Sequence, residues 1–386
     1  MIEVINRERC VYSGKKDLEH LFTLENFPLF MKCEDGYSSK EDDVFIDMEW
    51  YISKSTGAIQ LKNLIPMNIL YDTNHGGGSI GNTWRSYHKK FAQFIFQDNP
   101  NNILEIGGGH GTLSKEYKAL QPNSEWTILE PSPRPAKDVK AKYIKGYIEN
   151  IKRSDFSEDT ETIVHSYVIE HAYYPNEMIA SINKLLKNNQ IMYVSSPNFK
   201  VGLEKKYSNT LNFEHTYYID EYFLRKLLES NGFKILRLEY NFDDYAIFVS
   251  AMKVSDPLSL DLNLYENRCS LTHNLFIEFV DFYKNFVLSV NKKTEASGGN
   301  IYLFGAHVFA QYLIAFGLNI ENIIYILDND PNKQGKRLYG TDIKVKSPKI
   351  LQNIKNPIVV LKAGIYNDEI KKDILENINS SAIFWD

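Results

Sequence analysis

Two acidic residues and three alternating glycines are spaced so that they could hold a small polar molecule. Glu105, Gly107, Gly109 and Gly111 form the pattern E-x-G-x-G-x-G in the stretch NILEIGGGHGTL, between a strand-like run and a helix-like run. Such a turn presents backbone N–H groups and the positive end of a helix to a ligand. Glu130 ends the next strand-like run, where an acid can accept hydrogen bonds from both hydroxyls of a ribose. The spacing predicts a site for a ribose-containing ligand.

The spacing of the glycines distinguishes between the possible ligands. A dinucleotide, a phosphate or S-adenosylmethionine could each bind a glycine-rich turn. The dinucleotide fingerprint has its third glycine three residues after the second, as G-x-G-x-x-G, whereas the glycines here alternate. Glu105 lies at the end of the strand, where a carboxylate suits a cationic amino-acid head group. These features favour S-adenosylmethionine as the cofactor.

The elements that position these residues follow from the periodicity of the chain. Strand-like and helix-like runs alternate from residue 83 onward, which predicts an α/β fold with a doubly wound, Rossmann-like parallel sheet. A long helix is expected over 265–293 and a hydrophilic linker over 291–300, after which a second, smaller Rossmann-like series begins. Residues 1–70 show no long periodic segment. In the first series we expect helices over 83–96, 113–120, 176–187 and 220–233, and strands over 102–107, 125–131, 162–171, 190–198, 234–240 and 245–253.

Composition and charge exclude several classes of function. A chain of 386 residues is long enough for two or three domains, each with its own core. The net charge of -5 is spread over interspersed signs, so nucleic acid is not an expected partner. The sequence shows no leader peptide and no membrane-spanning run. Its three cysteines suit no disulfide framework, so we expect a cytoplasmic protein. We further expect a monomer or a weak homodimer.

Several stretches of the sequence carry a family resemblance. ILEIGGGHGTL, TILEPS, VIEHAYYPNEMIASINKLLKNNQIMYVSSPNF and LLESNGFKI resemble the ordered motifs of class I S-adenosylmethionine-dependent methyltransferases. NFEHTYYIDEYFLRKLLESNGF resembles the HEHxxYF segment of the three-domain sugar C-methyltransferases, and LFGAHVFAQYLIAFGLNIENIIYILDNDPNKQGKRLYGT resembles their C-terminal Rossmann-like domain. The resemblance implies methylation of a nucleotide-linked sugar. It also implies a small N-terminal domain (1–70), a methyltransferase domain (71–255), a helical linker (256–296) and a substrate-holding C-terminal domain (297–386).

The N-terminal part departs from this family. Members of the family hold a structural zinc ion with two C-x-x-C pairs, but in this chain Cys10 is followed by Ser13, and Ser53 and Thr56 occupy the second pair. Hydroxyl groups are poor zinc ligands at neutral pH, and the spacing gives no support for Cys33 as a replacement. We therefore expect that no metal binds and that the small domain keeps its fold through packing and hydrogen bonds.

The resemblance places the catalytic groups in the segment NFEH. Methyl transfer to a sugar carbon needs a base that removes a proton beside a carbonyl, and His215 is the first candidate because imidazole titrates near neutral pH. Glu214 could orient the ring, bind the substrate or act as the base itself. Asn212 stands where the family has a tyrosine, and Phe213 where it has a histidine. Asn212 is a candidate for binding the substrate, and it supports an alternative in which the methyl group goes to oxygen or nitrogen.

Five further positions are candidates for the binding of cofactor or substrate. Glu170 and His171 are expected at the end of the fourth strand, where ligands bind in open α/β sheets. In the family this pair mostly shapes the pocket. Tyr71 and His75 lie in a glycine-rich loop that could close over the acceptor. Ile148 lies in the stretch KGYIEN, where the resemblance places the adenine-binding loop.

The sequence thus predicts an S-adenosylmethionine-dependent methyltransferase with a nucleotide sugar or another small molecule as the acceptor. Two alternatives of other classes stay open at this point. One is an NAD-dependent enzyme with two Rossmann-like layers, against which the alternating glycines argue. The other is a sugar-nucleotide binding protein without catalysis. The acceptor would be a precursor in polysaccharide or secondary-metabolite assembly.

Overall fold

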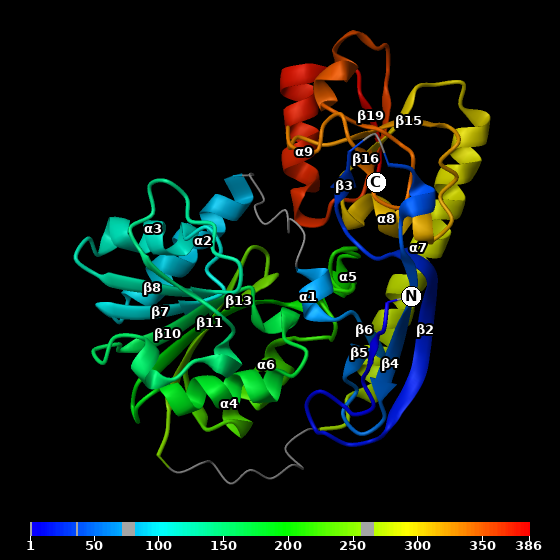
Figure 1. The fold of residues 1–386 in the computed structure, drawn as a ribbon. Coiled ribbons are helices and arrows are strands. Elements are labelled where there is room, and N and C mark those ends of the chain that lie inside the picture. Colours follow the sequence, from blue (N-terminus) through cyan, green and yellow to red (C-terminus); the bar gives the residue numbers. More distant parts are fainter. Residues whose placement is uncertain (1, 36–37, 72–81, 256–265) are drawn as a thin grey trace.

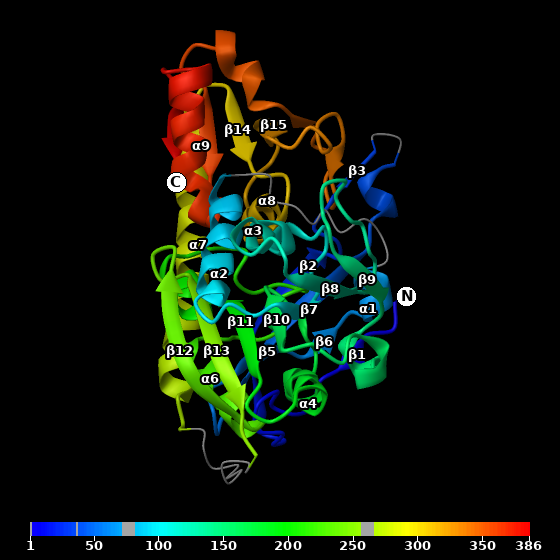
Figure 2. The same cartoon turned by 90° about the vertical axis from the view of Figure 1, so that its left-hand side faces the viewer.

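A seven-stranded sheet, called the central sheet here because it is formed by the middle part of the chain, lies at the left in Figure 1. The computed structural model describes residues 2–35, 38–71, 82–255 and 266–386. The sheet has the order β12-β13-β11-β10-β7-β8-β9, and all its neighbouring pairs are parallel except those of β13, which runs antiparallel to β11 and β12 (Figure 2). Its strands are β7 (Asn102–Ile106), β8 (Glu125–Glu130), β9 (Lys142–Lys145), β10 (Thr162–Ser166), β11 (Ile191–Pro197), β12 (Phe233–Asn241) and β13 (Ala246–Lys253). This arrangement confirms the predicted doubly wound α/β fold.

Helices cover both faces of this sheet. In Figure 1, α2 (Asn82–Phe96) and α3 (Thr112–Leu120) lie on one face, and α4 (Pro175–Leu185) and α6 (Glu221–Ser230) on the other. Alternate strand residues point to opposite faces, so Ile103 packs with the α2 and α3 side and Leu104 with the α4 and α6 side. Asp220 caps α6 by accepting a hydrogen bond from the Phe223 backbone N–H at 3.0 Å. The helices expected in this region are therefore present.

The fourth strand is shorter than predicted. The sequence favours a strand over 162–171, but β10 ends at Ser166. Tyr167 adopts a positive φ of 53°, which turns the chain out of the extended conformation. Ile169–His171 then form a short 3₁₀ helix. Glu170 and His171 consequently lie on a turn beyond the strand.

A second, five-stranded sheet forms the C-terminal part, with the order β17-β15-β14-β18-β19 and every pair parallel. Its strands are β14 (Ile301–Phe304), β15 (Ile323–Leu327), β17 (Val345–Lys346), β18 (Ile358–Leu361) and β19 (Ile383–Trp385), and its helices are α8 (Val308–Ala315) and α9 (Asn367–Asp373), which continues as a π-helix over Ile374–Ile378. The long helix α7 (Cys269–Ala296) runs from the N-terminal part towards this sheet (Figure 1). It extends beyond the predicted end at 293, so only 297–300 remain of the predicted linker.

The N-terminal part contains long strands that the sequence did not indicate. β2 (Leu18–Pro28), β4 (Phe45–Ser53) and β5 (Ile59–Leu61) form an antiparallel sheet. Register shifts in the pairing of β2 with β4, between His20 and Phe22 and between Leu24 and Phe27, interrupt the alternation that marks a strand in sequence. The remaining strands are β1 (Ile5–Asn6), β3 (Cys33–Glu34), β6 (Asn63–Leu64) and β16 (Arg337–Leu338), of which β1 pairs with β6 and β3 with β16.

The shorter helices complete the fold. The structure has the α-helices α1 (Met67–Leu70) and α5 (Phe199–Glu204), and the 3₁₀ helices Lys40–Asp42, Ile148–Asn150, Arg153–Asp155, Pro348–Asn353 and Gly364–Tyr366. Among the described residues, no helix is long and apolar enough to cross a membrane.

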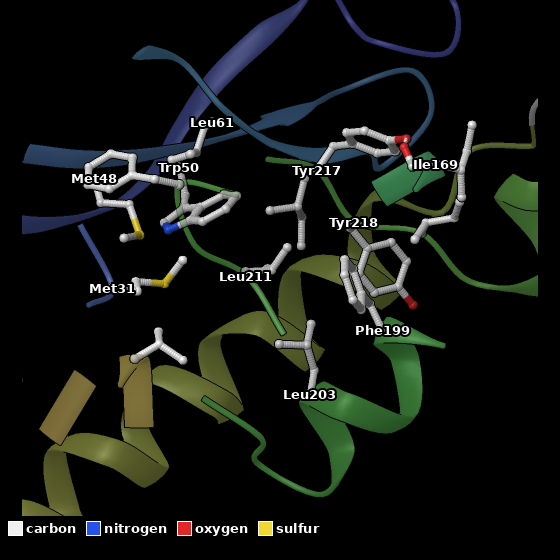
Figure 3. Close-up of a cluster of buried hydrophobic side chains, with 14 of the residues drawn as sticks. Met31, Met48, Trp50, Leu61, Ile169, Phe199, Leu203, Leu211, Tyr217 and Tyr218 are labelled. Carbon is white, nitrogen blue, oxygen red and sulfur yellow. Dashed lines mark hydrogen bonds between the residues drawn. The ribbon is translucent and has the colours of Figure 1, made fainter. Parts of the chain in front are cut away.

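A buried cluster joins the N-terminal sheet to the central part (Figure 3). Trp50 of β4 is 2% exposed and lies in this cluster with Tyr217 and Leu203. The Tyr217 hydroxyl donates a hydrogen bond to the carbonyl of Ile169. Replacing a buried tryptophan by alanine costs about 3–5 kcal/mol, so the packing around Trp50 is a major contribution to the stability of this junction.

Candidate active site

The glycine-rich loop connects β7 to α3 at the carboxyl edge of the central sheet. Gly107, Gly109 and Gly111 all have positive φ angles, of 71°, 50° and 82°. A Cβ atom on Gly107 would lie 2.5 Å from Val168 Cγ2, and one on Gly111 would lie 2.5 Å from Val139 Cγ1. A Cβ atom on Gly109 would have no neighbour within 4 Å in the part of the chain that the structure describes. The loop therefore packs closely against protein at its two ends and is open at its centre, as a cradle for a ligand requires.

Glu130 lies beside the open centre of this loop. Its Oε2 accepts a hydrogen bond from the Gly109 backbone N–H at 3.1 Å, and its Oε1 accepts one from the Ser132 N–H at 3.1 Å. The hydroxyl of Tyr143 donates to the Gly109 carbonyl at 3.4 Å. The structure thus brings together the two parts of the predicted ribose-binding site, and the partly exposed carboxylate of Glu130 is fixed in direction by two backbone donors.

Glu105 lies under the loop. Its side chain is 2% exposed, and its Oε2 accepts a hydrogen bond from Trp126 Nε1 at 2.7 Å. Burial raises its pKa from 4.5 to about 8, against the opposing effect of the Trp126 hydrogen bond. A Cβ atom on Gly108 would approach the Glu105 carboxyl carbon to 2.7 Å, so the carboxyl group supports the loop from below. The expected contact with the amino group of a ligand stays a prediction.

The expected adenine-binding position lies on a short turn after β9. Ile148 opens the 3₁₀ helix Ile148–Asn150 and is 6% exposed within the main hydrophobic core. The neighbouring residue Glu149 is exposed. A contact between Ile148 and an adenine ring stays a prediction.

Three side chains of types that can bind a metal ion meet next to the glycine loop, two from adjacent residues and one from a distant segment. Glu170, His171 and His215 each offer a ligand atom, and these atoms lie within 4.8 Å of one another. The rings of His171 and His215 have centroids 4.8 Å apart. Val168, which contacts the loop at Gly107, precedes Glu170 by two residues. Because β7 and β10 are parallel neighbours, the glycine loop and this cluster lie at the same edge of the sheet.

The cluster holds its groups in defined protonation states. Glu170 is 0% exposed, and burial raises its pKa to about 8. The carbonyl of Asn209 lies 2.8 Å from Nδ1 of His215, so Nδ1 carries a hydrogen and donates it. Burial lowers the pKa of His215, which leaves a neutral imidazole with its lone pair on Nε2. The hydroxyl of Tyr71 lies 3.1 Å from Nδ1 of His171.

Asn212 shapes the turn that carries His215. Its side-chain oxygen accepts hydrogen bonds from the backbone N–H groups of Glu214 at 2.8 Å and His215 at 3.1 Å, and its Nδ2 donates to the Asn209 carbonyl at 3.2 Å. Asn212 is 2% exposed. Its proposed contact with substrate stays a prediction, while Glu214 is partly exposed beside it. His75 lies outside the described residues.

Arg7 is a site-supporting residue that sequence reasoning missed. Its guanidinium donates to the carbonyl of Tyr173 at 2.9 Å and to that of Thr216 at 3.0 Å. These carbonyls belong to the segments that carry His171 and His215. Arg7 is 6% exposed, and burial lowers its pKa to about 10, so it stays charged at neutral pH. A single arginine in a polar N-terminal stretch carries no sequence signal for this role.

Hydroxyl groups link the positions at which the resembling family holds zinc. Cys10 Sγ lies 3.4 Å from Thr56 Oγ1, and the Thr56 N–H donates to Ser53 Oγ at 3.4 Å. Ser53 Oγ donates in turn to the Asp17 carboxylate at 3.0 Å. Cys33 lies elsewhere, with its Sγ 3.6 Å from the Ala306 carbonyl. Hydrogen bonds therefore connect the chain segments at these positions.

The fold and the loop together define a class. A seven-stranded sheet with one antiparallel strand, a glycine-rich turn after β7 and an acid at the end of β8 are the features of class I S-adenosylmethionine-dependent methyltransferases. Two family models agree with this class. Residues 81–238 match a family described as a methyltransferase domain, and residues 266–384 match one described as the C-methyltransferase C-terminal domain. The chain is a methyltransferase that depends on S-adenosylmethionine.

Solved structures of several methyltransferases are similar to parts of the chain. One is the 1,6-didemethyltoxoflavin-N1-methyltransferase of Burkholderia thailandensis with bound S-adenosylhomocysteine (11% identity, 45% of this chain and 82% of that chain, TM-score 0.36). Another is the magnesium protoporphyrin IX methyltransferase of Synechocystis PCC 6803 (15% identity, 46% of this chain and 90% of that chain, TM-score 0.36). A comparison with curated proteins gave no match. Since the two structures have different substrates, they do not indicate the acceptor of this chain.

Proposed function

We propose that this chain transfers a methyl group from S-adenosylmethionine to a carbon atom of a nucleotide-linked sugar. The observation that carries the proposal is the common edge of the sheet, where the glycine loop with Glu130 and the cluster of Glu170, His171 and His215 are joined through Val168. The description of the C-terminal family, which refers to C-methyltransferases, supports carbon as the methylated atom.

The loop and its acid fit the cofactor. The carboxylate of Glu130 can accept hydrogen bonds from the two ribose hydroxyls, and the open face at Gly109 admits the ligand close to the backbone. When bound, the cofactor supplies an electrophilic methyl group on a sulfonium. The chain orients the two reactants in line, and such positioning supplies much of the rate enhancement in transfers of this kind.

Two neighbouring groups are placed to remove the proton from the acceptor. His215 presents a neutral imidazole with an unprotonated Nε2, because Asn209 holds the other ring nitrogen as a donor. Glu214 precedes it and exerts an electrostatic effect on both His215 and Tyr71. Either group can accept a proton from a carbon beside a carbonyl group.

A division of labour between the parts of the chain is included in the proposal. The methyltransferase part (71–255) binds the cofactor and carries the base. The C-terminal part (297–386), connected through 256–296, and the small N-terminal part (1–70) hold the nucleotide end of the acceptor. Tyr71 and His171 lie beside the base and would contact the sugar.

A panel of nucleotide sugars incubated with enzyme and S-adenosylmethionine tests the proposal by mass spectrometry. We expect one acceptor to gain the mass of one methylene group, and fragment mapping to place that gain on a ring carbon. A gain on oxygen or nitrogen would favour the alternative that the asparagine at position 212 supports. Absence of methyl transfer to every member of a broad panel would contradict the sugar assignment.

A further inference from the structure

Glu170 is a buried acid without a described partner. It is 0% exposed, and neither carboxylate oxygen has a hydrogen-bond partner among the described residues. A buried carboxylate without compensation is costly, because the protein interior solvates charge poorly. Among the described residues, the carboxylate makes no hydrogen bond through which it would stabilise the fold. A ligand that Glu170 binds is therefore the more direct explanation of its presence.

The neighbours of Glu170 are the side chains that most commonly bind transition metals. The ligand atoms of Glu170, His171 and His215 all lie within 4.8 Å of one another. Metal–nitrogen and metal–oxygen bonds of about 2.0–2.2 Å place ligand atoms roughly 3–4 Å apart. Side-chain rotations that move these atoms by about 1 Å would bring them to that spacing.

Both histidines already have the support that metal-bound imidazoles need. A ligating histidine usually donates its other ring N–H to an oxygen atom, which fixes the ring and its tautomer. Nδ1 of His215 lies 2.8 Å from the Asn209 carbonyl, and Nδ1 of His171 lies 3.1 Å from the Tyr71 hydroxyl. In His215 this leaves Nε2 as the nitrogen that can bind an ion, and in His171 the same holds when the Tyr71 hydroxyl accepts the hydrogen of Nδ1. This arrangement is independent of the burial of Glu170.

We propose that Glu170, His171 and His215 bind one divalent transition-metal ion at the methyl-transfer site. Two imidazoles and one carboxylate suit Zn²⁺, Mn²⁺, Fe²⁺ or Co²⁺ better than Mg²⁺ or Ca²⁺, which prefer oxygen ligands. Three protein ligands leave positions open for an oxygen atom of the acceptor. The part played by the acceptor rests on the proposed function, whereas the binding of the ion does not.

This site changes the assignment of the base. With His215 as a ligand, its Nε2 lone pair is occupied, and the removal of the acceptor proton falls to Glu214. Arg7 would support this site as well, because it holds the backbone of the two segments that carry all three ligands.

The test uses the full chain, freed of metal with a chelator and then titrated with Co²⁺ and with Zn²⁺. We expect one ion per chain, seen as visible Co²⁺ absorption bands and by calorimetry. Glu170→Gln, His171→Ala and His215→Ala should each lose stoichiometric binding. Tyr71→Phe, which removes the hydroxyl beside Nδ1 of His171, should weaken binding by about 10-fold. His20→Ala is the matched control, because His20 is exposed on β2 and contacts Thr23.

Far-UV circular dichroism and thermal unfolding in chelator establish that each variant is folded. The proposal is overturned if the folded wild-type chain binds no ion, or if binding persists unchanged in all three ligand variants. Calorimetry with S-adenosylhomocysteine in the presence of chelator tests the cofactor site separately. Ion binding without cofactor binding would contradict the proposed function and leave the metal site intact. Cofactor binding without ion binding would contradict the metal site and leave the proposed function intact.

Discussion

The central and C-terminal sheets contain the same local arrangement at their first loops. In each, a strand leads through glycine into a helix, and an acid at or just after the end of the next strand accepts a hydrogen bond from the loop. Glu130 accepts from the Gly109 N–H at 3.1 Å, and Asp328 accepts from the Ala306 N–H at 2.9 Å. Both acids occupy the position from which a ribose can be bound in such folds.

The two loops differ in what else surrounds the acid. Asp328 forms an ion pair with Lys333 at 3.1 Å and also accepts from the Asp330 N–H at 2.9 Å. In the described part of the chain, Glu130 has no such cation. A residue of the chain itself thus neutralises one acid, while the other is available to a ligand. The same backbone arrangement therefore leaves its acid open in one sheet and pairs it with a lysine in the other.

A second difference lies beneath the loops. Glu105 lies two residues before Gly107, and Leu303 lies two residues before Gly305; both are buried. The C-terminal sheet thus has an apolar residue, Leu303, at the position beneath its loop. The central sheet instead buries an ionisable carboxyl group that is bonded to Trp126.

The largest effect on stability is expected from replacing Glu105, the buried ionisable residue beneath the loop of the central sheet. The pKa of Glu105 is raised from 4.5 to about 8 in the folded chain, so the folded state retains a proton that the unfolded state has released. Stability should fall as pH rises through this window, by up to about 1.4 kcal/mol per pH unit. Glu105→Gln should weaken that dependence, to which Glu170 with its raised pKa also contributes, and should be more stable than wild type at pH 9. Urea unfolding at pH 5, 7 and 9 measures the free energy of unfolding of each variant. Leu303→Ala is the control, because it changes the matching position of the other sheet without changing any titrating group.

The next effect concerns the two acids. Glu130→Ala should weaken binding of S-adenosylhomocysteine by about 10- to 100-fold, because a hydrogen bond to a charged group contributes about 1.5–3 kcal/mol. Asp328→Ala should leave that affinity within about 2-fold, since the acid lies in the other sheet. Isothermal titration calorimetry compares the two. Equal losses of affinity in both variants would show that Glu130 and Asp328 do not differ in the way proposed, with one acid open to a ligand and the other neutralised by a lysine.

The glycines that turn the two loops should also differ. Gly107 has a φ of 71°, and a Cβ atom added to it would lie 2.5 Å from Val168. Gly305 has a φ of 100°, and a Cβ atom added to it would lie 3.2 Å from Phe309. Alanine at either position costs about 1–2 kcal/mol for the left-handed backbone, and the closer contact adds to this at Gly107. Thermal unfolding should therefore show a larger loss for Gly107→Ala. An equal loss would mean that Val168 moves freely.

The smallest effect is expected at Lys333. Its side chain is 25% exposed, so its ion pair with Asp328 is partly screened by water. Lys333→Met should lower stability by no more than about 1 kcal/mol and leave the binding of S-adenosylhomocysteine unchanged. Denaturant unfolding and calorimetry on the same sample check both expectations. A measurable gain of nucleotide binding by the C-terminal part would show that Lys333 blocks a site.

Sequence reasoning succeeded where the signal is local. The alternation of strands and helices, the turn at Gly107 and the acid cap of α6 by Asp220 depend on residues close together in the chain. It failed where tertiary structure decides. The bulges in β2 disturb its alternation, and a positive φ at Tyr167 ends β10 early.

The candidate site shows the same limit. The glycine loop and Glu130 could be paired from their spacing, because successive parallel strands end at one edge of a sheet. The approach of His215 to Glu170 could not, since the intervening chain includes α4, β11 and α5. The donor for the Tyr173 and Thr216 carbonyls, Arg7, comes from a still more distant part of the chain.

The position of Arg7 has a consequence for biosynthesis. Its partners Tyr173 and Thr216 lie 166 and 209 residues later in the chain. The ribosome must therefore synthesise these segments before the Arg7 guanidinium can donate its hydrogen bonds to them. Contacts of such long sequence separation form late. The Arg7 hydrogen bonds are therefore expected to form after the segments that carry Tyr173 and Thr216 have been synthesised and have begun to fold.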